Sequence, residues 1–531
     1  MKVALIQCPA WLVDTPQHAH MLLAASLTQA GHHVWGFDIN IELYNRAQKA
    51  SELSAEWWLS QHIESFWCNR NNVLLEYRNS EAVRQNILEQ IRDLGIEAVC
   101  FTVHFTSLYF TDLFAADIRR QFENILICWG GPWCFRPHNN LKQIVHHYKY
   151  VDIACESDAH ESLPALLSSI ETNQNPESIA GYYIRSIHQN QIPTACKASG
   201  ESIETLAFSE LQCWDTSAYS FKYFPIWVSK ACVNRCAFCY ECNMHTKYSF
   251  RDPDNIVAEI LHQKSQEPFP DVFWFNASNI GGNPVLLKAL CQRLIASGAN
   301  IQWLSQIAVH KSIDPEMLSL LKQSGCKSLY FGIESGSNRV LKFMNKKFTV
   351  EEAESIILRT ANAGIEFNFN MIVGFPGETV LDFARSLWFI RKFLKYNINP
   401  STATCKISEG SRLFRYPEKY GVSGHHKHNW ISQGGSNNSM SRKWKKVYLD
   451  ALYTPRPANG FRLAKWFHDY IRYNATNNGI DKKMNFKIAL SRLGVFLSES
   501  FSAIPFMLFV VLAVSHVGLL QWLGQLKKPG N

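Results

Sequence analysis

The chain has 531 residues, which is too long for one hydrophobic core and predicts two or three domains. Hydrophobic residues make up 47% of it and charged residues 18%, a composition that excludes a disordered protein. The net charge of +8 is modest, and the basic residues are dispersed apart from 442–446 and 527–528. A nucleic-acid partner is therefore not expected.

The first 185 residues alternate short apolar strands with amphipathic helices. We expect strands at 2–7, 33–39, 97–103, 125–131 and 150–155, and helices at 18–31, 81–94, 108–122 and 160–171. A tryptophan-rich helical stretch at 52–67 stands outside this alternation. The pattern predicts an α/β domain over 1–185 with a doubly wound, Rossmann-like parallel sheet. In such sheets a ligand binds beyond the carboxyl ends of the strands.

A second alternation follows a linker at 186–225. Its strands are expected at 226–231, 271–278, 301–306, 328–335 and 367–377, each followed by a helical segment. This pattern predicts a full or partial (β/α) barrel over 226–420. Barrel chemistry lies at the carboxyl ends of the strands, and the unusual residues of this region fall there: Cys232, Asn276, Gln306, Glu334 and Gly374.

The alternation ends near residue 421. The polar stretch 421–446 is typical of a loop, and amphipathic helices are expected at 446–454 and 458–474, which gives a mostly helical region over 421–495. The loop contains three histidines that could bind a metal, although an exposed polar loop is the favoured interpretation: His425, His426 and His428.

Residues 503–524 form a stretch of 22 residues without a formal charge, and Lys527 and Lys528 follow it. Its length is sufficient to span a bilayer, with Trp522 and the two lysines as interfacial anchors. We expect a membrane-associated helix that either spans the bilayer or lies in its interface. A buried or dimer-forming apolar helix is the alternative.

Fifteen cysteines are present, and most lie in apolar, strand-like runs, where a buried thiol behaves as a small hydrophobic side chain. The N-terminal sequence MKVALIQCPAW does not resemble a signal peptide. The expected location is therefore the cytoplasm. In that reducing compartment, clustered cysteines bind metal more often than they form disulfides.

Cys232, Cys236 and Cys239 form a C-x3-C-x2-C triplet in CVNRCAFC, between an expected strand and an expected helix. Three thiolates can hold three irons of a 4Fe–4S cluster and leave the fourth iron open to a chelating molecule. Zinc would need a fourth ligand, for which Cys242 or His245 is near enough. The cluster is the favoured interpretation.

With an aromatic residue, Phe238, just before the third cysteine, this loop resembles that of the radical S-adenosylmethionine (radical SAM) superfamily. Two further matches follow in the expected order, FGIESGSNRVLKFMNK (331–346) and GIEFNFNMIVGFPGET (364–379). The N-terminal sheet, with ICWGGPW and VDIACES, looks like the cobalamin-binding domain of one branch of that superfamily. The resemblance covers roughly residues 1–420.

The resemblance implies roles for particular residues. The three cysteines would ligate the cluster. Contacts to S-adenosylmethionine would come from Phe238, Asn276, Glu334, Ser335, Ile372 and Gly374. One departure is Gly-Gly-Asn-Pro at 281–284, where some members of the superfamily have Gly-Gly-Glu-Pro and use the glutamate to bind the amino group.

The resemblance also implies that cobalamin is lined by Thr102, His104, Gly130, Gly131, Pro132 and Glu156. For the glycine pair, a plain strand-to-helix turn is the alternative. The Asp-x-His-x-x-Gly motif that supplies a histidine to cobalt in other cobalamin proteins is absent, because DTPQHAH (14–20) has neither its spacing nor its glycine. The implied cobalt therefore has no protein histidine on its lower face.

The implied function is a cobalamin-dependent radical SAM C-methyltransferase that acts on an unactivated carbon through a 5′-deoxyadenosyl radical. No catalytic side chain is assigned beyond the cluster ligands, and a low-potential electron donor of the flavodoxin or ferredoxin type would be the protein partner. One alternative is ring formation or oxidation without methyl transfer. Another is a non-enzymatic iron–sulfur or membrane-tethered interaction protein.

The substrate is expected to be a lipid or another membrane-associated apolar molecule, with a secondary metabolite or a peptide as the alternatives. The apolar stretch 503–524 and a basic face at 442–446 would suit a membrane-associated molecule. Methylthiolation of transfer RNA is disfavoured, because the enzymes that perform it carry a second cysteine triplet near the N-terminus. The cysteines near the N-terminus here are scattered: Cys8, Cys68 and Cys100.

Overall fold

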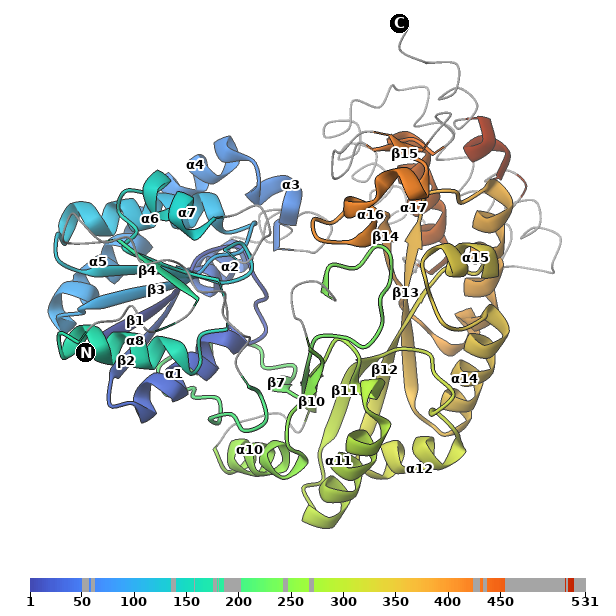
Figure 1. Cartoon of the computed structure of the whole chain (residues 1–531), viewed down its shortest axis with the longest axis horizontal. Coiled ribbons are helices and arrows are strands. Elements are labelled where there is room, and N and C mark those ends of the chain that lie inside the picture. Colours follow the sequence, from blue (N-terminus) through green and yellow to red (C-terminus); the bar gives the residue numbers. More distant parts are fainter. Residues whose placement is uncertain are drawn as a thin grey trace, which may run out of the picture. The chain divides into compact units, whose positions relative to one another are not determined.

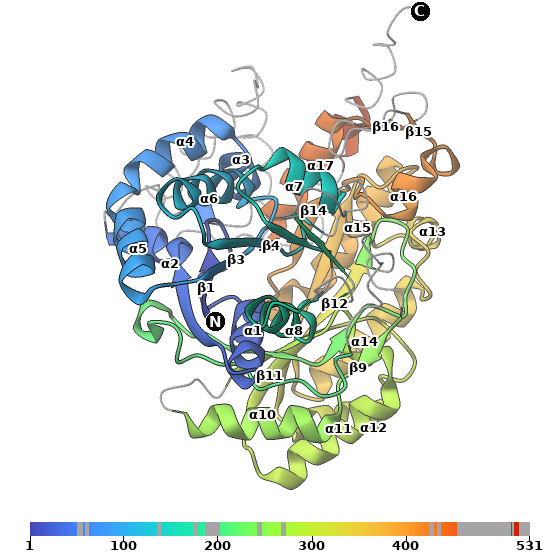
Figure 2. The same cartoon turned by 60° about the vertical axis from the view of Figure 1, so that its left-hand side comes forward.

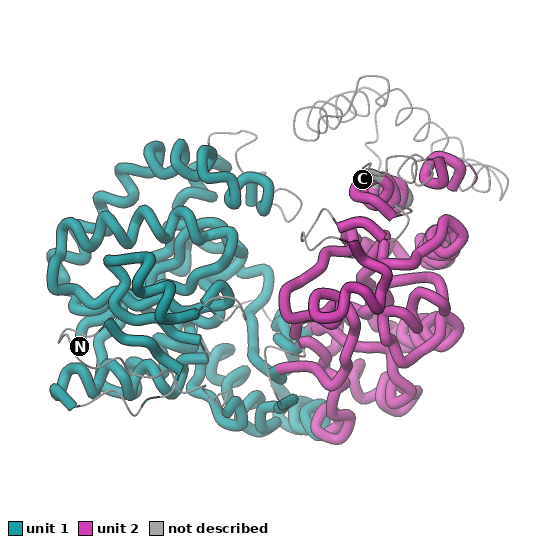
Figure 3. The backbone as a smooth tube through the Cα atoms, turned by 45° about the horizontal axis from the view of Figure 1, so that its top comes forward, with its two compact units in different colours: residues 1–230, 244–277, 289–303 teal, residues 231–243, 278–288, 304–531 magenta. Residues whose placement is uncertain are grey.

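The computed structural model forms two compact units (Figure 3). The first comprises residues 1–230, 244–277 and 289–303, and the second comprises residues 231–243, 278–288 and 304–531. The domain boundaries expected from the sequence stay a prediction. The structure describes residues 1–49, 57–58, 63–134, 140–156, 158–174, 179, 181–185, 202–241, 247–266, 272–423, 430–432, 437–453, 511 and 514–519.

A six-stranded sheet lies at the centre of the N-terminal region, with the strand order β2-β1-β3-β4-β5-β6 (Figure 1). The five strands β1 to β5 pair in parallel, and β6 pairs with β5 at the edge in the antiparallel direction. The order reverses between β1 and β3, which is the topology of a doubly wound sheet, as the sequence predicts. The strands are β1 (Lys2–Gln7), β2 (His33–Asp38), β3 (Ala98–Thr102), β4 (Leu126–Gly130), β5 (Ile153–Cys155) and β6 (Tyr182–Ile184).

Helices cover both faces of this sheet, with α1 and α8 on one face and α2, α5 and α6 on the other (Figure 2). They are α1 (His18–Gln29), α2 (Ile39–Lys49), α3 (Ile63–Trp67), α4 (Arg70–Asn79), α5 (Glu81–Leu94), α6 (Leu108–Gln121), α7 (Leu141–His147) and α8 (Ser162–Glu171). Of the tryptophan-rich stretch 52–67, residues 57–58 and α3 are described.

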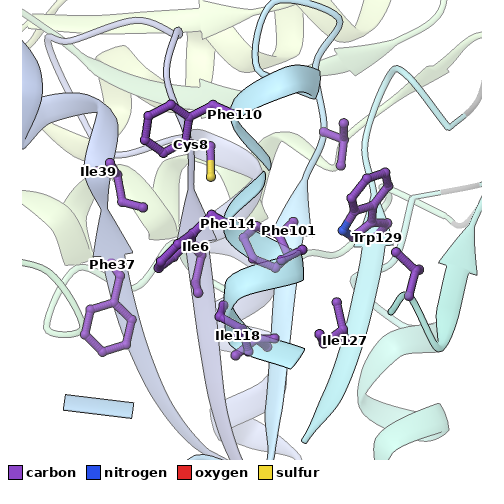
Figure 4. Close-up of a cluster of buried hydrophobic side chains, with 14 of the residues drawn as sticks. Ile6, Cys8, Phe37, Ile39, Phe101, Phe110, Phe114, Ile118, Ile127 and Trp129 are labelled. Carbon is purple, nitrogen blue, oxygen red and sulfur yellow. The ribbon is translucent and has the colours of Figure 1, made fainter. Parts of the chain in front are cut away.

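The core of the N-terminal sheet is a continuous layer of apolar side chains (Figure 4). The strands are nearly uninterrupted apolar runs because both of their faces are buried. Ile6 on β1, Phe101 on β3 and Ile127 on β4 are buried in the same cluster as Phe114 and Ile118 of α6. This packing holds the carboxyl ends of the strands at one rigid edge, where the expected ligand residues follow.

The second sheet has the strand order β14-β13-β12-β11-β10-β7. The pairs β7–β10, β12–β13 and β13–β14 are parallel, as the (β/α) alternation predicts. The strands are β7 (Phe224–Trp227), β10 (Val272–Asn276), β11 (Gln302–Ile307), β12 (Cys326–Glu334), β13 (Glu366–Val373) and β14 (Ser401–Thr404). The sequence analysis missed β14, because its four residues are small, mostly polar and only partly buried.

Helices follow these strands, and α12, α14 and α15 lie along one side of the sheet (Figure 1). The helices are α10 (Pro253–Ser265), α11 (Pro284–Ser297), α12 (Pro315–Gln323), α13 (Asn338–Phe343), α14 (Val350–Asn362), α15 (Val380–Phe393), α16 (Arg412–Arg415) and α17 (Ser439–Tyr453). Two short antiparallel pairs join β8 (Ser229–Lys230) to β9 (Ser249–Phe250) and β15 (Val422–Ser423) to β16 (Ile431–Ser432).

Side-chain caps determine where several of these helices begin. Asp252 and Asp314 each accept a backbone N–H of the first turn, and a proline follows each of them. Thr349 and Glu352 form a reciprocal capping box at the start of α14. These caps fix the residues at which α10, α12 and α14 begin.

The expected loop at 421–446 is wrong from Ser439 onward, because α17 begins there. The expected basic face at 442–446 is only partly on the surface, because Lys443 is exposed and Lys446 is half-buried but the other two basic side chains are buried. Arg442 and Lys445 are 2% and 0% exposed, and Trp444 beside them is buried. Arg442 donates a hydrogen bond to the carbonyl of Asn437, and Lys445 donates to Glu378. Both side chains are buried because this face of α17 packs against the end of β13.

Residues 514–519 pack against α17. Tyr448 hydrogen-bonds to Nδ1 of His516 at 2.8 Å, Trp444 contacts the same ring, and Val517 is buried. The rest of the apolar stretch 503–524 lies outside the described residues except for Val511, as do the expected helix 458–474 and the three loop histidines. No helix among the described residues is both long and apolar enough to cross a bilayer.

Candidate functional site

The three cysteines lie on one loop directly after β8. Cys236 is buried, and Cys232 and Cys239 are half-buried. The N–H of Cys239 donates to the carbonyl of Cys236 at 3.3 Å, so this part of the loop turns tightly. Burial raises the pKa of Cys232, so a metal ion that replaces its proton would stabilise the thiolate there. Cys242 and His245 lie outside the described residues.

Ala237 anchors the centre of the cysteine loop. Its side chain is fully buried, and its backbone is hydrogen-bonded in both directions. Its N–H donates to the carbonyl of Met344, and its carbonyl accepts the N–H of Leu413, each at 2.9 Å. A further bond joins Asn345 Nδ2 to the carbonyl of Arg235 at 2.6 Å. Two segments distant in sequence therefore hold the loop in place.

Glu334 ends β12 as the sequence predicts, and its carboxylate is paired with Lys346. Lys346 Nζ lies 3.2 Å from Glu334 Oε1 and donates to the carbonyl of Gly332 at 2.9 Å. Both side chains are more than nine-tenths buried. Burial disfavours the ammonium charge, but the negative groups around it, Glu334 foremost, together outweigh burial and raise the pKa of Lys346. Lys346 is therefore a buried cation.

A pocket opens beside the cysteine loop within the second unit. Its lining comes from the loop, from the segments after β10 and β11, and from the segment after α13. The lining residues are Val233, Asn234, Cys236, Asn279, Gly281, Gly282, Pro284, Ala308, Val309, His310, Asn345, Lys346, Lys347 and Phe348. One cluster cysteine and the buried cation thus face the same space.

The three cysteines supply the donor set of an iron–sulfur cluster. Among the described residues, no group of three His, Cys, Asp or Glu side chains is close enough to hold a single metal ion. Zinc needs its ligands to converge on one point, whereas a 4Fe–4S cube takes each thiolate on a different iron. Three cysteines on an anchored loop, next to a pocket and a buried cation, match the second requirement.

The segment after β10 has structural roles that the sequence did not reveal. Asn276 is exposed at the end of β10. Asn279 is buried, and its Oδ1 accepts the N–H of Ala308 at 2.9 Å, which fixes one wall of the pocket. Asn283 Oδ1 accepts the N–H groups of Val285 and Leu286 at 3.2 Å. Asparagine in Gly-Gly-Asn-Pro thus caps the start of α11.

The other residues expected to contact S-adenosylmethionine divide into two groups. Phe238 and Ile372 pack against the same apolar cluster, so the structure brings these two together. Ser335 is fully buried, and its Oγ accepts the N–H of Ser337 at 3.2 Å, so it stabilises the turn after β12. Their ligand contacts stay a prediction.

Gly374 has a backbone φ of +75°, which favours glycine. A Cβ at this position would overlap the side chain of Arg442, so that side chain occupies the space beside the glycine. The sequence analysis assigned Gly374 only to a contact with S-adenosylmethionine. The structure explains it by Arg442 of α17, which also lies over the Trp430 ring at 3.9 Å.

The residues expected to line cobalamin follow three neighbouring parallel strands. Thr102 is the last residue of β3, and His104 lies two residues beyond it. Gly130 is the last residue of β4, with Gly131 and Pro132 directly after it, and Glu156 directly follows β5. Because the carboxyl ends of parallel strands lie at one edge of a sheet, the structure brings these residues to that edge. Pro132 is exposed, and Glu156 is half-buried.

The two glycines at the end of β4 differ in their surroundings. Gly131 has a φ of +92°, and a Cβ there would lie 2.7 Å from Thr102 Cγ2 and 2.8 Å from the N of Val103. A tight turn therefore accounts for Gly131. A Cβ on Gly130 would meet only Cys155, at an ordinary distance of 3.7 Å, so packing does not require glycine there.

His104 belongs to a buried polar group that the sequence analysis did not identify. Its ring stacks on Trp11 with a centroid distance of 3.7 Å, and its Nε2 lies 2.6 Å from Gln17 Nε2. His20 is buried nearby, and within the described part of the chain neither of its ring nitrogens has a hydrogen-bond partner. Burial lowers the pKa of both histidines to about 3, so both are neutral.

Residues 227–390 match the sequence model of the radical SAM superfamily. The chain contains a radical SAM domain, and it is an enzyme. The radical SAM domain covers the cysteine loop, β10 to β13 and most of α15. The motifs quoted from the sequence and the anchored loop fall inside it, so the expectation of this superfamily is confirmed.

Curated relatives of this radical SAM enzyme share its sequence at low identity. An uncharacterised methyltransferase of Pyrococcus horikoshii is 21% identical over 342 residues, which cover 62% of this chain and 71% of the relative. A tRNA-2-methylthio-N(6)-dimethylallyladenosine synthase of Treponema pallidum is 23% identical over 321 residues, 57% of this chain. The match spans 64% of that synthase, less than two thirds of its length.

Two solved structures have the same fold over most of the radical SAM enzyme. The cobalamin-dependent S-adenosylmethionine radical enzyme OxsB matches with a TM-score of 0.64 and 12% identity, over 99% of this chain and 80% of that chain. The radical S-adenosylmethionine methyltransferase TsrM from Kitasatospora setae matches with a TM-score of 0.58 and 14% identity, over 79% of this chain and 78% of that chain. At these identities the likeness shows the fold alone.

Proposed function

We propose that this radical SAM enzyme uses cobalamin and methylates an unactivated carbon of a small apolar substrate. The observation that carries the proposal is that one chain contains both the anchored cysteine loop and a doubly wound sheet. Thr102, His104, Gly130 and Glu156 lie at the carboxyl edge of that sheet. OxsB and TsrM, whose structures hold cobalamin, have the same fold. The assignment of 1–185 to cobalamin and 226–420 to the barrel is part of the proposal.

Cys232, Cys236 and Cys239 would hold a 4Fe–4S cluster, and the edge residues of the N-terminal sheet would hold cobalamin. When bound, the reduced cluster supplies the electron that cleaves S-adenosylmethionine, and cobalamin supplies a methyl group. A low-potential flavodoxin or ferredoxin would reduce the cluster. The described residues place no acid–base pair in the pocket, and this chemistry requires none from the protein.

The chain's own residues would bind and orient S-adenosylmethionine and would exclude water from the site. Phe238 and Ile372 would give S-adenosylmethionine an apolar wall, since both pack on one cluster. Glu334 lies at the end of β12 with one carboxylate oxygen on Lys346, and its other oxygen would be available to a ligand. Asn276, Ser335 and Gly374 complete the proposed set of contacts.

For cobalamin, Gly130 offers the most specific argument. Its local packing would accept a side chain, so the absence of one leaves room at the carboxyl edge of the sheet. His104 is held by Trp11 and Gln17, which positions its ring instead of leaving it free to reach cobalt. His104 would therefore line the cobalamin and would not supply a ligand to its cobalt.

The class of substrate rests on the apolar stretch 503–524, because the buried Arg442 and Lys445 no longer supply a basic face. A lipid or a secondary metabolite fits this chemistry. If the tail carries the protein to membranes, removing residues 503–531 should release it from the membrane fraction. An unchanged distribution would contradict the lipid proposal.

The proposal is tested by anaerobic turnover of reconstituted full-length protein with cobalamin, a low-potential reductant and S-adenosylmethionine. Mass spectrometry would follow 5′-deoxyadenosine and S-adenosylhomocysteine, with Cys236→Ser as the inactive control. Both products together support methyl transfer. Only 5′-deoxyadenosine, persisting with the true substrate, favours ring formation or oxidation. Neither product from protein with an intact cluster contradicts the proposal.

A further inference from the structure

The segment 344–346 binds the cysteine loop through its backbone and its side chains. Met344 accepts the N–H of Ala237 at 2.9 Å, and Asn345 Nδ2 donates to the carbonyl of Arg235 at 2.6 Å. Asn345 has a φ of +60°, a left-handed conformation that asparagine tolerates. This turn ends α13 and directs Lys346 toward the loop instead of toward solvent.

Lys346 carries its charge next to the cysteines. Its Nζ lies 5.5 Å from the ring centroid of Phe238, the residue just before Cys239. Lys346 and Cys236 line the same pocket.

The protein makes room for this cation and fixes it. The Lys346 side chain is 9% exposed and holds two hydrogen bonds, to Gly332 and Glu334. A Cβ on Gly332 would lie 3.0 Å from Glu334 Oε1 and 3.3 Å from Lys346 Nζ. Glycine at this position therefore leaves the ion pair its space inside β12.

We propose that Lys346 is a positioning residue that places a fixed positive charge beside the cysteine loop and raises the reduction potential of the cluster held there. This inference rests on the proposed function. A cluster with thiolate ligands gains a negative charge when it is reduced, and a nearby cation stabilises that charge. Because the pair is buried, solvent screens the effect weakly. Net charge near a cluster is one of the factors that set its potential.

The test compares three variants of the full-length, reconstituted protein without S-adenosylmethionine. Lys346→Met removes the charge, Lys346→Arg keeps it, and Lys342→Met removes an exposed charge from the nearby helix α13. Potentiometric titration followed by electron paramagnetic resonance gives the midpoint of each cluster. Iron content and the cluster absorbance confirm that each variant is loaded.

We expect Lys346→Met to lower the ratio of reduced to oxidised cluster at a fixed potential about tenfold, a shift of about 59 mV to more negative potential for a one-electron couple. The midpoint potential of Lys346→Arg should stay near that of the parent protein, and that of Lys342→Met should be unchanged. A Lys346→Met midpoint equal to that of the parent protein would overturn the inference.

A second variant keeps the test decisive if Lys346→Met fails to hold a cluster. Glu334→Gln removes the negative partner and leaves the cation, so the midpoint should move to more positive potential. A midpoint that is unchanged or more negative would overturn the inference. If the parent protein itself binds no cluster, the proposed function fails, which is a different result from an unshifted variant.

Discussion

Lys445 and Glu378 form an ion pair in which neither side chain is exposed to solvent. Their charged atoms lie 2.6 Å apart. The same carboxylate oxygen accepts the N–H of Gly374 at 2.8 Å, so the pair ties α17 to the loop that follows β13. Helix α17 therefore completes the region of the radical SAM domain that contains Gly374.

Breaking this pair should destabilise the protein. Lys445→Met leaves the Glu378 carboxylate buried without its partner, which costs about 3–5 kcal/mol. We expect a lower denaturant midpoint, measured by the loss of circular dichroism in urea. The double variant Lys445→Met/Glu378→Leu should recover much of the loss, because no unpaired charge remains. A single variant as stable as the parent protein would show that the pair does not matter for stability.

Gly374→Ala should destabilise the protein more than a positive φ alone explains. The new methyl group would overlap Arg442, in addition to about 1–2 kcal/mol of backbone strain. Gly298→Ala is the matched control, because Gly298 has a φ of +63° and no atom within 4 Å of the added carbon. Thermal unfolding compares the two. Equal losses would mean that Arg442 moves aside without cost.

Replacing any one of Cys232, Cys236 and Cys239 by serine should abolish most of the bound iron, because each thiolate would hold a different iron. Iron content and visible absorbance after anaerobic reconstitution measure this. Cys213→Ser is the control, since Cys213 is also half-buried but lies outside the loop that carries the three cysteines. Normal iron content in a loop variant would exclude that cysteine as a ligand.

Asp38 should make stability fall as the pH rises toward neutrality. Burial raises its pKa to about 7, against hydrogen bonds from Ile41 and Tyr219. An acid with a raised folded pKa contributes stability that is complete below its unfolded pKa near 4 and lost as the pH rises through 7. Asp38→Asn stays neutral, so its stability relative to the parent protein should be higher at pH 8 than at pH 5.

Urea midpoints at several pH values measure this difference. Asp254→Asn serves as the control, because Asp254 is exposed and its replacement should leave the pH dependence unchanged. Parallel curves for Asp38→Asn and the parent protein would contradict the expectation.

The strands and the cysteine loop could be predicted from the sequence because their signals are local. Apolar runs such as VALI or FWF bury both faces of a parallel strand, and three cysteines within eight residues need no distant context. Glu334 could be placed at the end of its strand for the same reason. Its pairing with Lys346 could not, since nothing local distinguishes Lys346 from the adjacent Lys347.

The roles of α17 could not be predicted, because they depend on tertiary contacts. Arg442 and Lys445 belong to a basic run that is typical of an exposed surface. They are buried because Glu378 neutralises Lys445 and two backbone carbonyls, of Asn437 and Trp430, accept from Arg442. These partners lie 5 to 67 residues away in sequence, and a window of neighbouring residues cannot identify most of them.

The two backbone bonds of Ala237 have a consequence for biosynthesis. The cysteine loop is translated first. Met344 and Leu413, whose backbones hydrogen-bond to Ala237 of the loop, are translated more than a hundred residues later. While the chain is still emerging from the ribosome, the cysteines lie on an unsupported loop. The loop can therefore take the conformation of the folded protein only after residue 413 has been translated.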